Sequence, residues 1–136
     1  MGKLKPYIIS EDARTQGQFY IDSLGGQLMS IMTHEEAMGA QHADKDKVMH
    51  MCIEVAGDNY IFLADGMEPF THGSGLYLSL ELDSDSQARD AFEKLSAGGQ
   101  VKYPFELQPF GLYLGEVMDQ YGVWWMITAQ NEAADA

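Results

Sequence analysis

The sequence predicts an α+β fold in which two βαβββ modules pair, each forming a cupped mixed sheet. Three observations predict it: one internal repeat, alternating apolar residues on both sides of each repeat copy, and short turn signals between the strands that follow. With 136 residues, the chain is long enough to bury a core. We expect a single domain with modules at about 4–66 and 75–130, a long loop at 33–47 and a frayed tail at 132–136.

The repeat lies at the ends of two expected helices. Residues 19–28 align with residues 92–101, an offset of 73 (from 19 to 92), and each copy passes through a Gly-Gly pair into a strand. Glycine adopts the left-handed backbone that closes a helix. Acidic and serine residues at 11–12 and 83–86 precede the two helices, where they cap free N–H groups and suit the helix dipole.

Strand patterns surround both helices. Residues 76–82 alternate strictly between leucine and other residues, as in a half-buried strand. The expected strands are 6–9, 27–32, 48–55 and 59–64 in the first module, and 76–82, 100–103, 112–118 and 123–128 in the second. Turns at 56–59 and 119–122 predict a hairpin at the end of each module.

Strand alternation assigns the side chains to two faces. The side chains expected to pack beneath the helices are Met49, Met51, Ile53, Val55, Leu76, Leu78, Leu80 and Leu82. The opposite face is then mixed, with aromatic rings, a single lysine, a histidine and carboxylates, and we predict that it lines a ligand pocket. The predicted lining is Lys5, Tyr7, His50, Cys52, Tyr60, Phe62, Tyr77, Ser79, Glu81, Trp124 and Met126. The alternative is that these rings fill the cup or seal a dimer interface.

The charge excludes several classes of partner. Eight basic residues against 21 acidic ones leave a formal charge of −13, which repels nucleic acid and anionic membrane surfaces. No apolar run reaches the roughly 20 residues that span a bilayer, and no signal region is seen, so we expect a cytoplasmic protein. The single cysteine, Cys52, excludes an internal disulfide and is expected to be a small buried hydrophobe.

Four stretches, 19–26, 46–50, 78–83 and 109–127, resemble the vicinal-oxygen-chelate superfamily of glyoxalases, bleomycin-resistance proteins and extradiol dioxygenases. Within that superfamily the chain resembles the PhnB-like proteins. The resemblance implies the glyoxalase/bleomycin-resistance/dioxygenase fold and a homodimer.

Metal-dependent members of that superfamily hold a divalent ion with His, Gln or Glu on the first, fourth, fifth and eighth strands. The matching positions here are Lys5, Phe62, Tyr77 and Met126, and none of them suits a hard metal ion. We therefore predict no cofactor and no metal at the usual place. A displaced divalent-metal site stays open, with His50, Glu54, Glu81 and Glu116 as its candidate ligands.

Two functions are compatible with these residues. The favoured one is a small-molecule-binding protein that sequesters or senses a partly aromatic or cationic ligand, as metal-free bleomycin-resistance proteins do. The alternative is a glyoxalase- or dioxygenase-like enzyme that uses His50 or Glu81 as general acid or base, or the displaced metal. PhnB-like sequences are sometimes described as methyltransferases, but Gly73-Ser74-Gly75 precedes a strand and so differs from the glycine loops of nucleotide-cofactor sites.

Overall fold

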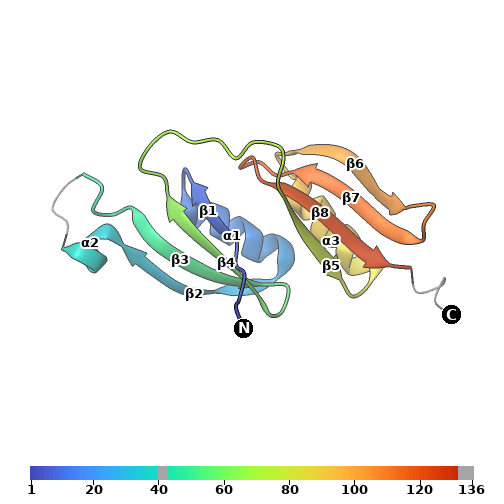
Figure 1. Ribbon diagram of the computed structural model, residues 1–136, viewed down its shortest axis with the longest axis horizontal. Helices are drawn as coiled ribbons and strands as arrows, with labels where there is room; N and C mark the ends of the chain where they lie inside the picture. Colours follow the sequence, from blue (N-terminus) through green and yellow to red (C-terminus); the bar gives the residue numbers. More distant parts are fainter. Residues whose placement is uncertain (40–42, 132–136) are drawn as a thin grey trace. The chain divides into compact units, whose positions relative to one another are not determined.

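The computed structural model describes residues 1–39 and 43–131, and its chain divides into two compact units, Met1–Phe70 and the part from Thr71 onward. Each unit is a four-stranded mixed sheet with one long helix against one face (Figure 1). The predicted α+β fold of paired βαβββ modules is confirmed. The expected tail at 132–136 lies outside the described residues. No described helix has the length and apolar character needed to span a membrane.

The first unit contains β1 (Tyr7–Ser10), α1 (Ala13–Leu24), β2 (Gly26–Thr33), α2 (His34–Met38), β3 (Val48–Val55) and β4 (Asn59–Asp65). Its strand order is β1-β4-β3-β2, in which β1 runs parallel to β4 and the other pairs are antiparallel. Helix α2 falls within the range expected to be a loop. It begins at a capping box, in which the Thr33 side chain and the Glu36 side chain each accept from the other residue's backbone N–H.

The second unit contains β5 (Tyr77–Leu82), α3 (Asp85–Ser96), β6 (Gln100–Leu107), β7 (Leu112–Met118) and β8 (Trp124–Gln130). Its strand order, β5-β8-β7-β6, repeats that of the first unit, again with one parallel pair. Strand β6 continues four residues past the predicted end at Tyr103 and includes Pro104. Proline is tolerated there because β6 is an edge strand, where one missing N–H breaks no ladder.

The Gly-Gly repeat has the same geometry in both units. Gly25 and Gly98 have φ angles of 77° and 75°, in the left-handed region that L side chains rarely adopt. A Cβ on Gly26 would overlap the Glu54 carbonyl, and one on Gly99 would overlap the Met118 carbonyl. The first glycine therefore turns the chain out of the helix, and the second lets the new strand lie close against its neighbour.

Two carboxylates connect elements within their units. Asp65, at the end of β4, accepts from the backbone N–H groups of Ala13 and Val48, both at 2.7 Å, and so joins the start of α1 to the start of β3. Asp119, only 1% exposed, follows β7 and accepts from the Tyr121 and Val123 N–H groups and from the Trp125 indole. Both bind backbone donors that would otherwise be unsatisfied.

Helices α1 and α3 begin at the predicted caps and cover the predicted apolar faces. The side chains of Asp12 and Ser84 accept from the N–H groups three residues later. The core side chains of the first unit include Tyr20, Val48, Met51, Ile53, Val55 and Leu63. Those of the second include Phe92, Leu95, Val117, Trp125 and Ile127.

Two predicted core positions are wrong. Met49 is only half-buried, and Val48 is fully buried instead, because a bulge places Thr33 opposite Val48 but Met32 opposite His50. The extra residue in β3 reverses the alternation at that point. Leu76 is 78% exposed, because β5 begins one residue later, at Tyr77.

Candidate functional site

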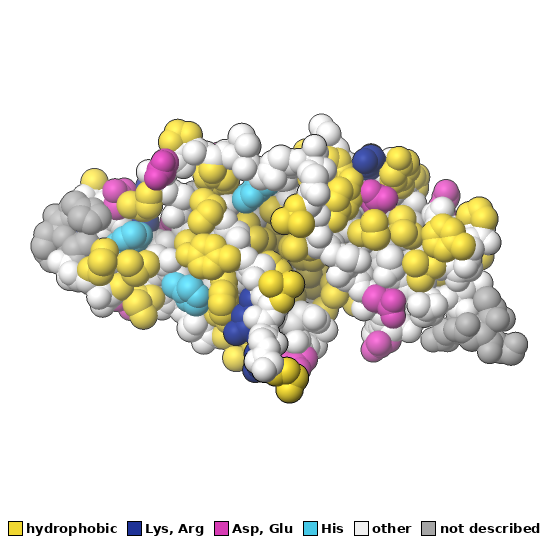
Figure 2. Space-filling view, in the orientation of Figure 1, with side chains coloured by type: hydrophobic (Ala, Val, Ile, Leu, Met, Phe, Trp, Pro, Cys, Tyr) yellow, Lys and Arg dark blue, Asp and Glu magenta, His cyan; other side chains and the backbone are white. Residues whose placement is uncertain are grey.

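The helix-free face of the first unit is an aromatic surface with a lysine on it. Tyr7 on β1 and Phe62 on β4 are register partners with ring centroids 6.5 Å apart in an edge-to-face arrangement. The His50 ring on β3 lies 4.7 Å from the Phe62 ring. The Lys5 ammonium lies 4.9 Å from the Phe62 centroid, within cation–π distance. Figure 2 shows hydrophobic groups gathered over β3 and β4 on this face.

One end of this face is polar. The Tyr60 hydroxyl donates to Glu54 at 3.0 Å, and the Gln27 amide reaches the other oxygen of the same carboxylate at 3.4 Å. That hydrogen bond and the negative charge of Glu54 raise the pKa of Tyr60. Burial raises the pKa of the Cys52 thiol, against the lowering effect of Lys5, so the thiol is not activated as a nucleophile.

The helix-free face of the second unit has its own ring pair. Tyr77 on β5 and Trp124 on β8 are register partners, with centroids 5.4 Å apart and planes inclined by 30°. Both side chains are half-buried. Met126, also half-buried, lies between Ser79 and Glu116 in the ladder, while Ser79 and Glu81 are exposed.

Sequence reasoning missed Lys102, which lies on this second face. Its ammonium donates to the Tyr77 hydroxyl at 3.2 Å and lies 5.9, 5.5 and 5.7 Å from the Tyr77, Tyr103 and Trp124 centroids. The prediction of a single lysine on the pocket face is therefore wrong. Lys102 is the extra residue of a β6 bulge, since Val101 pairs with Val117 and Tyr103 with Glu116. A bulge redirects a side chain in a way that simple alternation does not show.

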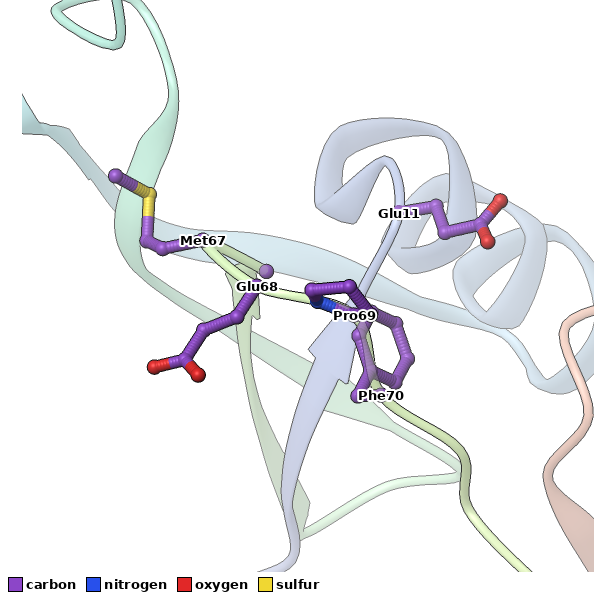
Figure 3. Close-up of a pocket in the computed structure, with 6 residues that line it drawn as sticks. Glu11, Met67, Glu68, Pro69 and Phe70 are labelled. Atoms are coloured by element: carbon purple, nitrogen blue, oxygen red, sulfur yellow. The ribbon is translucent and has the colours of Figure 1, made fainter.

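A separate hollow, also not predicted, lies in the first unit beyond the end of β4. Its volume of about 430 Å³ would accept a small organic molecule, and it is lined by Glu11, Gly66, Met67, Glu68, Pro69 and Phe70. Figure 3 shows that the carboxylates of Glu11 and Glu68 point away from each other. These two carboxylates therefore do not converge to orient a ligand.

Comparison with known proteins decides the family. The family model described as 3-demethylubiquinone-9 3-methyltransferase matches residues 5–128, almost the whole chain. The chain belongs to this PhnB-like family of the vicinal-oxygen-chelate superfamily. No curated protein matched the chain.

Solved structures agree with the fold of this PhnB-like chain. A Pseudomonas aeruginosa protein is 28% identical with a TM-score of 0.83, over 96% of this chain and 98% of the other. A PhnB protein from Bacillus cereus is 21% identical with a TM-score of 0.76, over 94% and 99% of the two chains. The fosfomycin resistance protein FosX from Listeria monocytogenes, whose structure contains Mn(II) and sulfate, is 9% identical with a TM-score of 0.66, over 95% and 93%.

The residues of this PhnB-like chain do not fit the superfamily's metal. Two of the four matching positions are Lys5 and Phe62, and the Lys5 ammonium lies against the Phe62 ring. An ammonium repels a metal cation and offers it no lone pair. Tyr77 accepts a hydrogen bond from a second lysine, and Met126 offers only a soft thioether. These four side chains therefore do not form the metal site of the metal-dependent members.

The residues do not fit a methyl-donor nucleotide cofactor either, despite the family's name. Such sites use a glycine-rich turn between a strand and a helix of a parallel sheet. Here Ser10, Glu11 and Asp12 join β1 to α1, and Gly73-Ser74-Gly75 precedes strand β5. Both sheets are mixed.

The candidate catalytic residues gain no support as acids or bases. His50 contacts the rings of Tyr7 and Phe62, and Glu81 is exposed on β5. Within residues 1–39 and 43–131, no three His, Cys, Asp or Glu side chains come together in a group that could hold a metal. The displaced site of His50, Glu54, Glu81 and Glu116 and the enzyme alternative therefore stay predictions.

Proposed function

We propose that this PhnB-like protein binds a small, partly aromatic organic molecule on the helix-free faces of its sheets, without a metal ion. The observation that carries the proposal is the same in both units: aromatic rings and a lysine ammonium occupy the face that no helix of the unit covers. Ring faces offer flat apolar contact, and the ammonium offers directed donors, which is the composition of a ligand site.

The chemistry of these side chains supports binding rather than catalysis. The Phe62 and Trp124 rings carry no nucleophile, the raised pKa of Lys102 keeps it an ammonium, and the thiol of Cys52 has a raised pKa. A protein that holds its ligand unchanged needs shape, stacking surface and a few polar contacts, all of which these faces contain.

Fluorescence of Trp124 tests the proposal, because this ring is half-buried on the predicted face. Trp125 is 2% exposed and bonded to Asp119, so it reports the core instead. We expect small aromatic compounds to change the emission saturably in the native protein and not in Trp124→Phe. Saturable aromatic ligands that leave Trp124 unaffected, and whose affinity is also unchanged in Phe62→Ala, would place binding elsewhere and contradict the proposal.

Metal analysis tests the proposal that the ligand binds without a metal ion. Untagged protein is expected to contain no stoichiometric divalent metal, and Zn, Ni, Mn or Fe should not change Trp124 emission. A stoichiometric ion lost in His50→Ala or Glu81→Gln would establish the displaced site and overturn the metal-free reading.

We also propose that the protein is a homodimer. Support comes from the edge strands: β2 exposes Leu28, Met29 and Met32 at 45–47%, and β6 exposes Val101 and Leu107 at 46–48%. Exposed apolar groups on edge strands are typical of surfaces that another chain covers. Light scattering during gel filtration should give twice the mass of 15.1 kDa, and a monomer at micromolar concentration would contradict this.

A further inference from the structure

Lys102, like Lys5, lies against aromatic rings. Acidic residues outnumber basic ones 21 to 8, and Lys47 and Lys94 form ion pairs with Asp44 and Asp90. Among the described residues, by contrast, no carboxylate oxygen lies within 4.0 Å of the Lys102 ammonium. Its nearest neighbours are instead three aromatic rings and the Tyr77 hydroxyl, while the Glu116 carboxylate, opposite Tyr103 in the ladder, acts on it through charge without an ion pair.

The side chain of Lys102 reaches across the sheet of the second unit. Its strand β6 and the strand of Tyr77, β5, are at opposite edges of the order β5-β8-β7-β6. Three strand spacings of about 4.8 Å separate them along a flat sheet, roughly 14 Å in all. Because Nζ and the Tyr77 hydroxyl are 3.2 Å apart, the two side chains reach toward each other across the helix-free face.

The ammonium keeps hydrogen-bonding capacity and its charge. A lysine has three N–H donors, and the hydrogen bond to the Tyr77 hydroxyl uses one of them. The hydrogen bond with Tyr77 holds the pKa of Lys102 above its ordinary value of 10.5. Lys102 is therefore a fixed cation at the rim of an aromatic surface, exposed to solvent, with donors left for an acceptor.

We propose that this cluster, Lys102 with Tyr77, Tyr103 and Trp124, selects an aromatic anion: a ring that stacks on the exposed faces of the cluster and carries a carboxylate or similar acid group bonded to Lys102. The inference rests on the proposed function and names its ligand class. The rings already have a cation among them, so a second cation would be repelled, whereas an acid group would form a charge-assisted hydrogen bond. A purely apolar ligand would offer no acceptor to the remaining N–H donors of Lys102.

The test uses two probes of the same shape, 2-naphthoate and 2-naphthamide, titrated against Trp124 fluorescence. The native protein should bind the acid about five- to tenfold more tightly than the amide, the range expected for one partly screened charge-assisted bond. Lys102→Met should remove that preference and leave the affinity for the amide within about twofold. Lys102→Arg should keep the preference.

Lys94→Met is the matched control, because Lys94 lies on α3, on the other side of the same sheet, and is ion-paired to Asp90. It removes the same charge from the same unit and should leave both affinities unchanged. Equal binding of acid and amide by the native protein, or equal loss of preference in Lys94→Met, would overturn the inference while leaving the binding function in place. Failure of both probes to alter Trp124 emission would overturn the binding function as well.

Discussion

Asp119 offers the sharpest test of how the β7–β8 hairpin is held. Its side chain is 1% exposed and accepts from the backbone N–H groups of Tyr121 at 2.8 Å and Val123 at 3.1 Å through one oxygen. The other oxygen accepts from the Trp125 indole at 2.9 Å. Asp119→Asn keeps the shape of the side chain, but its amide has only one oxygen. If that oxygen still accepts from the backbone N–H groups, the Asn NH₂ faces the Trp125 indole N–H, and two donors then face each other.

The expected cost follows from these contacts. One charge-assisted bond is lost, the indole donor is left buried without an acceptor, and the remaining bonds lose their charge, which together costs about 2–4 kcal/mol of unfolding free energy. For a chain of 136 residues, each kcal/mol lowers Tm by roughly 3–5 °C. Urea unfolding followed by far-ultraviolet circular dichroism measures the change without relying on tryptophan emission.

A double-mutant cycle with Trp125→Phe isolates the indole contact. In the Phe background no indole donor is left to be orphaned, so Asp119→Asn should cost at least about 1 kcal/mol less than in the native background. Asp90→Asn is the control, because its 61% exposed ion pair with Lys94 should contribute less than about 1 kcal/mol. A cost below about 0.5 kcal/mol for Asp119→Asn, or strictly additive effects in the cycle, would refute the reasoning.

Three further predictions concern the fold. Gly26→Ala should lower the free energy of unfolding by more than about 2 kcal/mol in the same urea assay, because its Cβ would overlap the Glu54 carbonyl. Gly75→Ala, which has open space around it, should change the free energy of unfolding by less than about 0.5 kcal/mol. Asp12→Ala should cost about 1 kcal/mol at pH 7 through loss of the α1 cap, and this cost should shrink below pH 3.8 in urea melts at graded pH. Calorimetry should show one transition of about 95 kcal/mol for the 136 residues, with equal calorimetric and van't Hoff enthalpies, because we propose that the two units unfold together.

The sign of the acid dependence follows from the cap of α1. Hydrogen bonds from the Thr15 side chain and backbone lower the folded-state pKa of Asp12 from 3.8. Its contribution to stability is therefore fully present above pH 3.8 and is lost as the pH falls through the folded pKa. A loss of stability in Asp12→Ala that stays constant down to pH 2 would contradict this account.

Two separate calorimetric transitions would contradict the proposal that the two units unfold together. Equal losses of stability in Gly26→Ala and Gly75→Ala would contradict the close approach of Gly26 to the Glu54 carbonyl.

Much of the fold could be predicted because its signals are local. The Gly-Gly pairs specify a left-handed turn and a close strand approach wherever they occur, and both copies do so at Gly25–Gly26 and Gly98–Gly99. The caps at Asp12 and Ser84 act on N–H groups only three residues away. Alternation likewise separated Ile53 in the core from Cys52 on the opposite face. None of these depends on a distant part of the chain.

The candidate site could be predicted only where the strands are regular. Tyr7, Phe62, Tyr77 and Trp124 follow the alternation and lie on the helix-free faces of their own units. Lys102 does not follow it, because it is the additional residue of a bulge, and Met49 fails for the same reason in β3. A bulge depends on how two strands align with each other, which neither strand's sequence shows by itself.

By itself, then, the sequence determined the repeated βαβββ order, the starts of α1 and α3 and the poor metal-ligating character of Lys5, Phe62, Tyr77 and Met126, because these depend on residue type and short-range spacing. Only the tertiary structure decided that Lys102 crosses its sheet to reach Tyr77, and that Asp65 gathers backbone donors from the separate segments α1 and β3. The physical reason is that register, curl and side-chain reach are properties of several strands at once. They are set when the strands pair and the core packs against the helix.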